Sequence, residues 1–343
     1  MTQYKSGLQV LQRIGGGFFG QVHLGRDDVH GTVAVKVLAR KPGQSDADWA
    51  TLKTGFLAEG QNLSKAKHRN VVQVHHIVEA EDGNSVCICM AYCSGGSLQA
   101  SFERGPMSLA ECHRVATDVL MGLSALHARG MLHRDIKPGN ILLDSGAVAQ
   151  ISDFGLVTDK LVLGYGSQAG YSDHIAFEVW QGSGTSAKTD IWAFGMTLYR
   201  LLHGEAWYKE SGAPRAIIRD GGFVDTLKWL PHIPKPWRRA IRKMLNDDPA
   251  ARFQNTAQTL NAVSGLPTDP VWSVEVTPGL VRWERQTQTR RVVVEWIRHS
   301  DHKHEWSAWS EPLGQGRKKS LGGSEGVVSK AKARSGLETF FAS

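Results

Sequence analysis

The chain has 343 residues, of which 41% are hydrophobic and 21% charged, and its formal net charge is +7 at neutral pH. This composition is typical of a soluble globular protein, and no apolar run approaches the roughly 18 residues that a membrane-spanning helix needs. The first ten residues lack the charged start and apolar core of a signal peptide. The four cysteines form no CxxC pair, so we expect free thiols in a reducing cytoplasm: Cys87, Cys89, Cys93 and Cys112.

The first third of the chain predicts strands around one helix. Residues 8–37 alternate apolar and polar side chains with a period of two, interrupted by a glycine cluster and by the turn sequence DDVHG. Residues 46–66 predict a helix because apolar side chains recur every three or four residues, with the carboxylate of Glu59 in the same stripe. Residues 71–92 again read as strands.

The following part predicts helices. Residues 108–129 form a strongly amphipathic pattern that begins with a capping box made by Ser108 and Glu111. Most of 190–262 also has helical periodicity. A mainly β part followed by a mainly α part places the first 265 residues in the α+β class.

The character of the chain changes after residue 265. Residues 270–312 hold five of the eleven tryptophans among β-branched alternations, which predicts a small Trp-rich β module whose tryptophans serve as core more than as a ligand platform. Residues 313–343 hold six Lys or Arg against two Asp or Glu, and we expect a basic flexible tail with no nucleic-acid partner. Three histidines of the module lack the further ligands of a zinc site and are expected on the surface: His299, His302 and His304.

A glycine-rich string of the form G-x-G-x-x-G-x-V occupies residues 15–22. Glycines let the backbone approach phosphate groups closely, so that the amides face the anionic oxygens. A dinucleotide-binding turn would place a similar string before a helix, whereas this one lies between two predicted strands. The string therefore favours a phosphate-covering hairpin, with a plain glycine turn as the alternative.

Lys36 stands in the apolar strand sequence VAVK, sixteen residues after Gly20. A cation at this place could hold the α- and β-phosphates of a nucleotide. An unpaired carboxylate in the apolar stripe of the following helix would be costly, so we expect Glu59 to form an ion pair with Lys36. A Glu59 side chain that points into water is the alternative.

The strongest signal is the string HRDIKPGN at residues 133–140, followed by D-F-G starting at Asp153. Asp135 could orient a substrate hydroxyl and accept its proton, and Lys137 could neutralise a phosphoryl group as it moves. Asn140 and Asp153 could supply oxygen ligands to Mg²⁺, a hard cation. A chance polar loop does not explain both strings at this spacing.

With these motifs, residues 8–262 resemble the eukaryotic-type Ser/Thr protein kinase superfamily. The resemblance implies a bilobal fold, a β-rich N-lobe at 8–92 and an α-rich C-lobe at 94–265, with Mg-ATP, or Mn²⁺ in place of Mg²⁺, bound between the lobes. The Lys of HRDIKPGN marks the branch that phosphorylates Ser and Thr of protein substrates. The residues implied to bind ATP are Ile14, Gly15, Gly16, Gly17, Phe18, Phe19, Gly20, Gln21, Val22, Ala34, Lys36, Met90, Cys93 and Leu142.

The same resemblance implies structural and regulatory roles. Phe154 would join a hydrophobic spine anchored by Asp190, and Arg252 would pair with Glu178. Autophosphorylation is expected between Gly155 and Glu178, where Arg134 would meet the phosphate. The candidate acceptors are Thr158, Ser167, which is the first choice, and Ser172.

The sequence departs from the family pattern after D-F-G, in the run GYSDHIAFE that ends at Glu178. Phe177 replaces a proline, and Tyr171 stands where a threonine normally contacts the catalytic Asp and Lys, although Ser172 could substitute. The peptide-docking surface therefore differs from the usual one.

Three functions from different classes fit these observations. The first is an active Ser/Thr kinase, and the second is a pseudokinase scaffold or nucleotide sensor acting through its C-terminal module. The third is a small-molecule kinase of related fold. The module itself fits either a site that recruits a protein partner or a structural brace.

Overall fold

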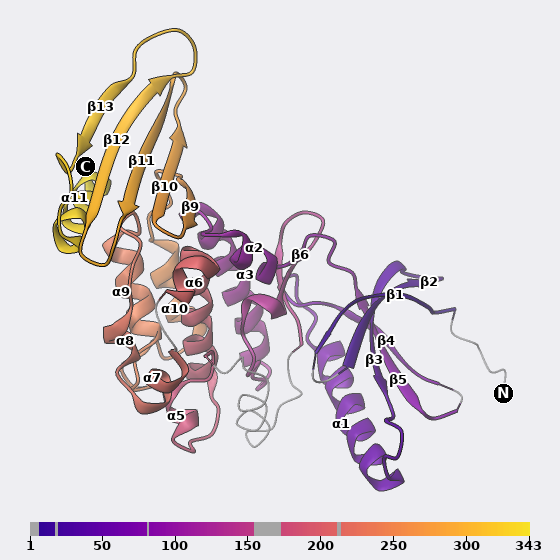
Figure 1. Cartoon of the computed structure of the whole chain (residues 1–343). Helices are drawn as coiled ribbons and strands as arrows, with labels where there is room; N and C mark the ends of the chain where they lie inside the picture. Colours follow the sequence, from indigo (N-terminus) through magenta and orange to yellow (C-terminus); the bar gives the residue numbers. More distant parts are fainter. Residues whose placement is uncertain (1–6, 18–19, 81, 154–172, 211–213) are drawn as a thin grey trace.

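The computed structural model shows three parts in chain order, a β-rich lobe, a helical lobe and a C-terminal sheet covered by a helix (Figure 1). The C-terminal sheet lies at the far end of the helical lobe from the β-rich lobe. The α+β class, the two lobes and the additional β module predicted from the sequence are confirmed. The structure describes residues 7–17, 20–80, 82–153, 173–210 and 214–343.

The first lobe is one antiparallel sheet with a helix on one face. Its strand order is β1-β2-β3-β5-β4, and the helix α1 (Asp46–Lys65) contacts β4 and β5. Phe56 of this helix and Ile88 of the sheet belong to the main core, while Val33, Val35 and Cys89 form a smaller cluster. The strands are β1 (Gln9–Gly17), β2 (Gly20–Asp27), β3 (Gly31–Ala39), β4 (Val74–Glu79) and β5 (Ser85–Ala91).

The second lobe is built around α6 (Ala187–Lys209), which is buried along nearly its whole length. A helix that is covered on all sides needs apolar residues all round, and the sequence IWAFGMTLYRLL supplies them. The helix α3 (Leu109–His127) begins at the predicted capping box of Ser108 and Glu111, which is confirmed. The other helices are α2 (Leu98–Arg104), α5 (Phe177–Trp180), α7 (Pro214–Asp220), α8 (Phe223–Thr226), α9 (Lys235–Met244) and α10 (Thr256–Ser264).

A small three-stranded sheet lies in the helical lobe, where the chain enters it from the β-rich lobe. Its order is β6-β7-β8, and a 3-10 turn, η1 (Pro138–Asn140), leads directly into β7. The strands are β6 (Gly96–Ser97), β7 (Ile141–Leu143) and β8 (Ala149–Ile151).

The C-terminal part is a five-stranded antiparallel sheet in the order β13-β12-β11-β10-β9. Four of its tryptophans are buried, as expected for core residues: Trp272, Trp283, Trp296 and Trp306. The strands are β9 (Ser273–Thr277), β10 (Leu280–Gln286), β11 (Arg290–Arg298), β12 (His304–Pro312) and β13 (Lys319–Gly323).

The prediction of a flexible tail at 313–343 was wrong. This segment forms β13, which pairs with β12, and the helix α11 (Lys330–Ala342). Leu337 is fully buried, and the ring of Phe341 lies 5.1 Å from that of Trp283. The sequence LETFF orders the segment because it buries apolar surface against the tryptophans of the sheet.

The C-terminal module packs on the helical lobe through buried and charged contacts. Nε1 of Trp283 donates to Nδ1 of His232 at 2.9 Å, and burial lowers the pKa of His232 to about 3, so the neutral ring keeps its acceptor. Arg238 of α9 pairs with Glu338 of α11 at 2.7 Å. These contacts make the module a continuation of the helical lobe.

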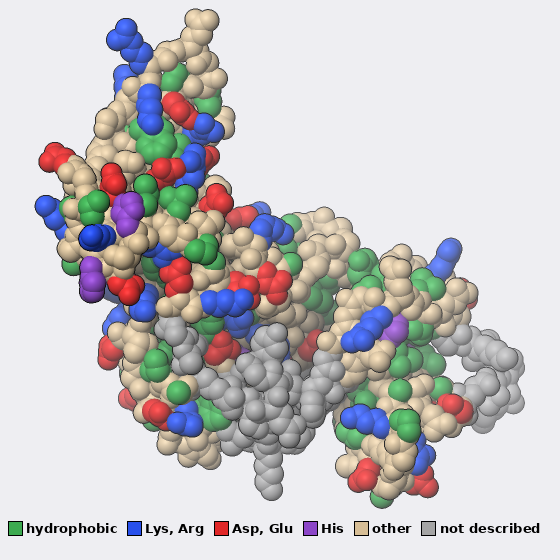
Figure 2. Space-filling model, in the orientation of Figure 1, with side chains coloured by type: hydrophobic (Ala, Val, Ile, Leu, Met, Phe, Trp, Pro, Cys, Tyr) green, Lys and Arg blue, Asp and Glu red, His purple; other side chains and the backbone are tan. Residues whose placement is uncertain are grey.

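The surface carries mixed charge. Lys and Arg side chains are interspersed with Asp and Glu over the face seen in Figure 2. Within the described ranges, no helix has both the length and the apolar character to cross a bilayer.

We predict that Trp283→Ala lowers the free energy of unfolding by about 3–5 kcal/mol, because it opens a large cavity between the module and the helical lobe. Thermal denaturation of the full chain measures this as a fall in Tm of more than about 5 °C. Trp309→Ala is the matched control, since Trp309 is only partly buried and its ring faces Lys318 at 3.8 Å. Equal losses in the two variants would contradict the interface described here.

Candidate active site

A cavity of about 560 Å³ lies between the β-rich and helical lobes. Its walls come from β1, β2, β3 and β5 on one side, and from β6, β7 and the segments before β7 and after β8 on the other. Ten of the residues predicted to bind ATP line it: Ile14, Gly15, Gly16, Gly20, Val22, Ala34, Lys36, Met90, Cys93 and Leu142.

Strand register brings the apolar walls together. Val22 of β2 is paired with Lys36 of β3, and Ala34 of β3 is paired with Met90 of β5. Directly opposed residues project to the same face of a sheet, so these four side chains share the cavity. Val22, Ala34 and Met90, together with Leu142 from β7, form an apolar slot at this end of the cavity, which suits a flat ring system.

The glycine-rich string is a hairpin between β1 and β2, as the sequence favoured. Gly17 pairs with Gly20, and Gly20 has a φ of +137°. A Cβ at Gly20 would lie 2.6 Å from the carbonyl oxygen of Val37, so no other residue fits there. Phe18 and Phe19 lie outside the described residues. Gln21 is exposed and does not line the cavity, because neighbouring residues of a strand point to opposite faces.

Lys36 and Asp153 form a partly buried ion pair at the inner end of the cavity, with Nζ 2.7 Å from Oδ1. Burial by itself would raise the pKa of the Asp153 carboxyl, but the charge and hydrogen bond of Lys36 outweigh it and lower that pKa. Glu59 lies in α1, but its side chain is outside the described part of the structure. The ion pair between Lys36 and Glu59 therefore stays a prediction.

Asp135 is buried and surrounded by donors. Nζ of Lys137 lies 2.8 Å from its Oδ2, and Nδ2 of Asn140 donates to the same oxygen at 2.7 Å. Burial by itself would raise the pKa of the Asp135 carboxyl, but His174 and Lys137 outweigh it and hold the pKa well below its usual range. Asp135 is therefore ionised at neutral pH.

His174 is a site residue that the sequence did not predict. It is buried, and its Nε2 lies 2.8 Å from Oδ1 of Asp135, the oxygen not used by Lys137 and Asn140. The only signal in the sequence was its place in the run GYSDHIAFE, which departs from the family pattern. Arg200 of α6 was also missed, since it is buried, lines the cavity and lies 3.8 Å from the carboxylate of Asp173.

Asp190 fixes the backbone of the loop that carries Asp135. Its carboxylate is fully buried and accepts the backbone N–H groups of His133 at 2.9 Å and Arg134 at 2.8 Å. Nε2 of His127 lies 2.8 Å from the same carboxylate. Arg134 has a φ of +67°, a left-handed conformation that is costly for a non-glycine residue and is held here by these bonds.

Some of the other predicted structural residues make contacts in the structure, and the rest lie outside the described ranges. Arg252 and Glu178 form a bidentate ion pair, with nitrogen–oxygen distances of 2.7 and 2.6 Å. Nε of Arg134 donates to Oγ1 of Thr185 at 2.8 Å. Four of these predicted residues lie outside the described part of the chain: Phe154, Thr158, Ser167 and Ser172.

The residues at the inner end of the cavity fit a nucleotide with a hard divalent cation. Asn140 donates through Nδ2 to the side-chain and backbone oxygens of Asp135, which leaves its Oδ1 as the oxygen able to bind a cation. Asp153 adds a carboxylate, and Lys36 adds a cation for phosphate. Oxygen ligands of this kind suit Mg²⁺.

A β-rich lobe and a helical lobe with these charges around one cavity define the class of protein as a protein kinase. A sequence model of the family described as "Protein kinase domain" matches residues 8–263, and the chain belongs to this family.

Curated relatives are similar to this chain over most of its length. The chain is 27% identical over 306 residues to the serine/threonine-protein kinase ssp1 of Schizosaccharomyces pombe, covering 81% of this chain and 46% of that protein. It is 32% identical to the CBL-interacting serine/threonine-protein kinase 21 of Arabidopsis thaliana, over 71% of this chain and 58% of that protein. It is 28% identical to the serine/threonine-protein kinase PrkC of Bacillus subtilis, over 74% of this chain and 39% of that protein. The chain thus spans about half the length of these relatives or less.

We predict that Asp190→Ala lowers the free energy of unfolding by about 2–6 kcal/mol, since it leaves two buried backbone N–H groups without acceptors at about 1–3 kcal/mol each. Urea denaturation followed by tryptophan fluorescence measures the change. Asp225→Ala is the control, because the exposed pair of Asp225 with Arg242 is worth at most about 1 kcal/mol. A loss for Asp190→Ala no larger than for the control would refute the anchoring role.

Proposed function

We propose that the chain is an ATP-dependent protein kinase that transfers the γ-phosphate of Mg-ATP to Ser and Thr hydroxyls of proteins. The observation that carries this proposal is the gathering of Lys36, Asp135, Asn140 and Asp153 around one cavity. Membership of the protein kinase family and the names of the curated relatives support it. Phosphoryl transfer depends on positioning and on charge, and these four groups supply both.

Each group has a distinct task in this proposal. Lys36 holds the phosphates of the nucleotide, and the apolar slot around Ala34 holds its base. Asp135, ionised by its neighbours, orients the substrate hydroxyl and accepts its proton, while Lys137 offsets charge on the transferred group. Asn140 and Asp153 would hold Mg²⁺, with Mn²⁺ as a substitute, and the ion neutralises phosphate charge when bound.

The two other functional classes are less well supported. A pseudokinase would lack at least one of the four charged or polar groups of the cavity, and all four are present and close together. A small-molecule kinase is not supported by the curated relatives, which are named as serine/threonine-protein kinases.

Three finer features belong to the same proposal. The enzyme autophosphorylates between Gly155 and Glu178, with Ser167 as the first candidate, and Arg134 receives the phosphate. The free cysteines support a reducing, cytoplasmic setting. The C-terminal module acts as a brace, as its contacts with the helical lobe suggest, and any protein partner binds its exposed surface.

We predict that Asp153→Ala lowers kcat by about 10²-fold or more, because it removes a charge from a site where charge placement is the catalysis. Transfer of labelled phosphate from ATP to a generic Ser/Thr protein substrate measures the loss. The exposed Asp301→Ala serves as the control, and an unchanged Tm shows that the fold is intact. Activity within about tenfold of wild type would show that Asp153 does not hold the cation.

We predict that His174→Ala lowers kcat by about tenfold or more while the KM for ATP stays constant, because the Asp135 carboxylate loses one of its positioning contacts. His174 also lowers the pKa of Asp135, so its removal raises that pKa. The acid limb of the pH profile of kcat/KM then moves to higher pH.

His174→Gln separates positioning from packing, since the amide keeps a donor near Oδ1 of Asp135. It should restore part of kcat and part of the acid limb. A fall in kcat with an unchanged pH profile in both variants would mean that His174 serves the fold alone.

A further inference from the structure

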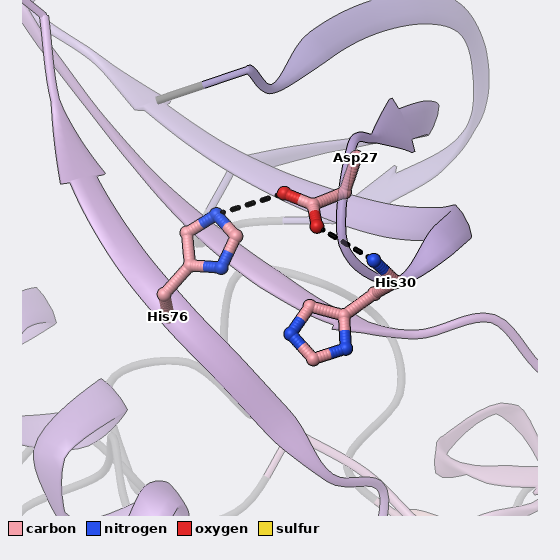
Figure 3. Close-up of side chains that lie close together, drawn as sticks. All are labelled: Asp27, His30 and His76. Atoms are coloured by element: carbon pink, nitrogen blue, oxygen red, sulfur yellow. Dashed lines mark hydrogen bonds and ion pairs between the residues drawn. The ribbon is translucent and has the colours of Figure 1, made fainter. Parts of the chain in front are cut away.

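A second cluster of polar side chains lies in the β-rich lobe, away from the cavity. Asp27 ends β2, His30 lies in the turn before β3, and His76 lies in β4. Each offers one ligand atom, and these atoms all lie within 4.8 Å of one another. None of the three lines the cavity described above. Figure 3 shows the Asp27 carboxylate between the His76 ring and the backbone nitrogen of His30.

The carboxylate of Asp27 is held in place by its own turn. Oδ1 accepts the backbone N–H of Val29 at 3.0 Å and that of His30 at 2.8 Å. These two bonds fix the carboxylate, with Oδ2 directed towards His76.

The contact between Asp27 and His76 is better suited to a shared cation than to a hydrogen bond. Nε2 of His76 lies 3.4 Å from Oδ2, beyond the range of about 2.7–3.2 Å for a good N–H···O bond. This nitrogen is shielded from solvent and has no hydrogen-bond partner among the described residues. Two ligands at about 2.0–2.1 Å from a tetrahedral zinc ion are about 3.3 Å apart, which matches the observed separation.

His30 provides the third group, and a fourth residue steadies it. The rings of His30 and His75 are stacked, with centroids 3.9 Å apart and planes within 10°. The stacked ring of His75 limits the orientations open to the His30 ring. Neutral imidazole is the form in which histidine ligates metals.

We propose that Asp27, His30 and His76 bind a divalent cation of the zinc type, with a further position open to water. Two imidazole nitrogens and one carboxylate oxygen suit Zn²⁺, whereas Mg²⁺ prefers oxygen ligands alone. The sheet order places β3 and β5 between β2 and β4, so the ion would tie the β2–β3 turn to the edge strand across two others. It would thereby stiffen the lobe that carries the glycine hairpin and Lys36.

The test uses the full chain, stripped with a chelator and then titrated with Zn²⁺ by calorimetry in excess Mg²⁺, which occupies sites made of oxygen ligands. We expect the wild type to bind one equivalent more than His30→Ala, His76→Ala and Asp27→Asn. Asp27→Asn keeps an oxygen for the turn and removes only the charge. His302→Ala is the matched control for loss of an exposed histidine and should bind as the wild type does.

Two further readouts complete the test. Co²⁺ should give the visible absorption bands of a tetrahedral site in the wild type but not in His76→Ala. Zn²⁺ should raise the Tm of the wild type and leave that of His30→Ala unchanged. Because His30 is exposed, we expect His30→Ala to keep the fold. If His76→Ala or Asp27→Asn unfolds, the result for His30→Ala decides whether the zinc site exists. Equal zinc stoichiometry in wild type and His30→Ala, or no binding by either, overturns the proposal, and the cluster is then only a polar turn.

Discussion

The buried carboxylate of Asp190 is the contact on which the arrangement of the site depends. It belongs to the first turn of the buried helix α6 and accepts hydrogen bonds from the backbone N–H groups of two successive loop residues, His133 and Arg134. A buried carboxylate is costly unless its oxygens accept hydrogen bonds, so these bonds fix the loop relative to the helix. That geometry forces Arg134 into a left-handed conformation and sets the direction in which Asp135 leaves the loop.

Charge around the cavity is balanced in pairs. Lys36 neutralises Asp153, and Lys137 and His174 surround Asp135, so that neither carboxylate needs to take up a proton. The proposed base and the proposed cation ligand therefore stay ionised without a nucleotide, which is the electrostatic preorganisation that phosphoryl transfer requires. The proposed zinc-type site lies in the β-rich lobe, as Lys36 does, but outside the cavity. It is separate from the charged groups of the cavity, and its ligands include imidazole nitrogens.

The C-terminal module shows how short apolar segments decide order. Leu337 and Phe341 of α11 close one face of a sheet whose tryptophans would otherwise be exposed. The same sheet contacts the helical lobe through Trp283 and His232, so the module shares a continuous core with the kinase domain. The composition of residues 313–343, basic and rich in glycine and serine, predicted a flexible tail because composition averages over the few apolar residues that pack.

The sequence by itself determined the lobes, the capped helix at Ser108 and most of the predicted residues that line the cavity, because these depend on periodicity and on motifs of fixed spacing. Only the tertiary structure decided which groups meet across long separations. His174 reaches Asp135 from 39 residues away, and His76 approaches Asp27 from another strand, although no pattern in the sequence links either pair. Such contacts follow from sheet order and helix packing, which local sequence does not encode, since the side chains concerned are ordinary histidines until the fold brings them beside a buried carboxylate.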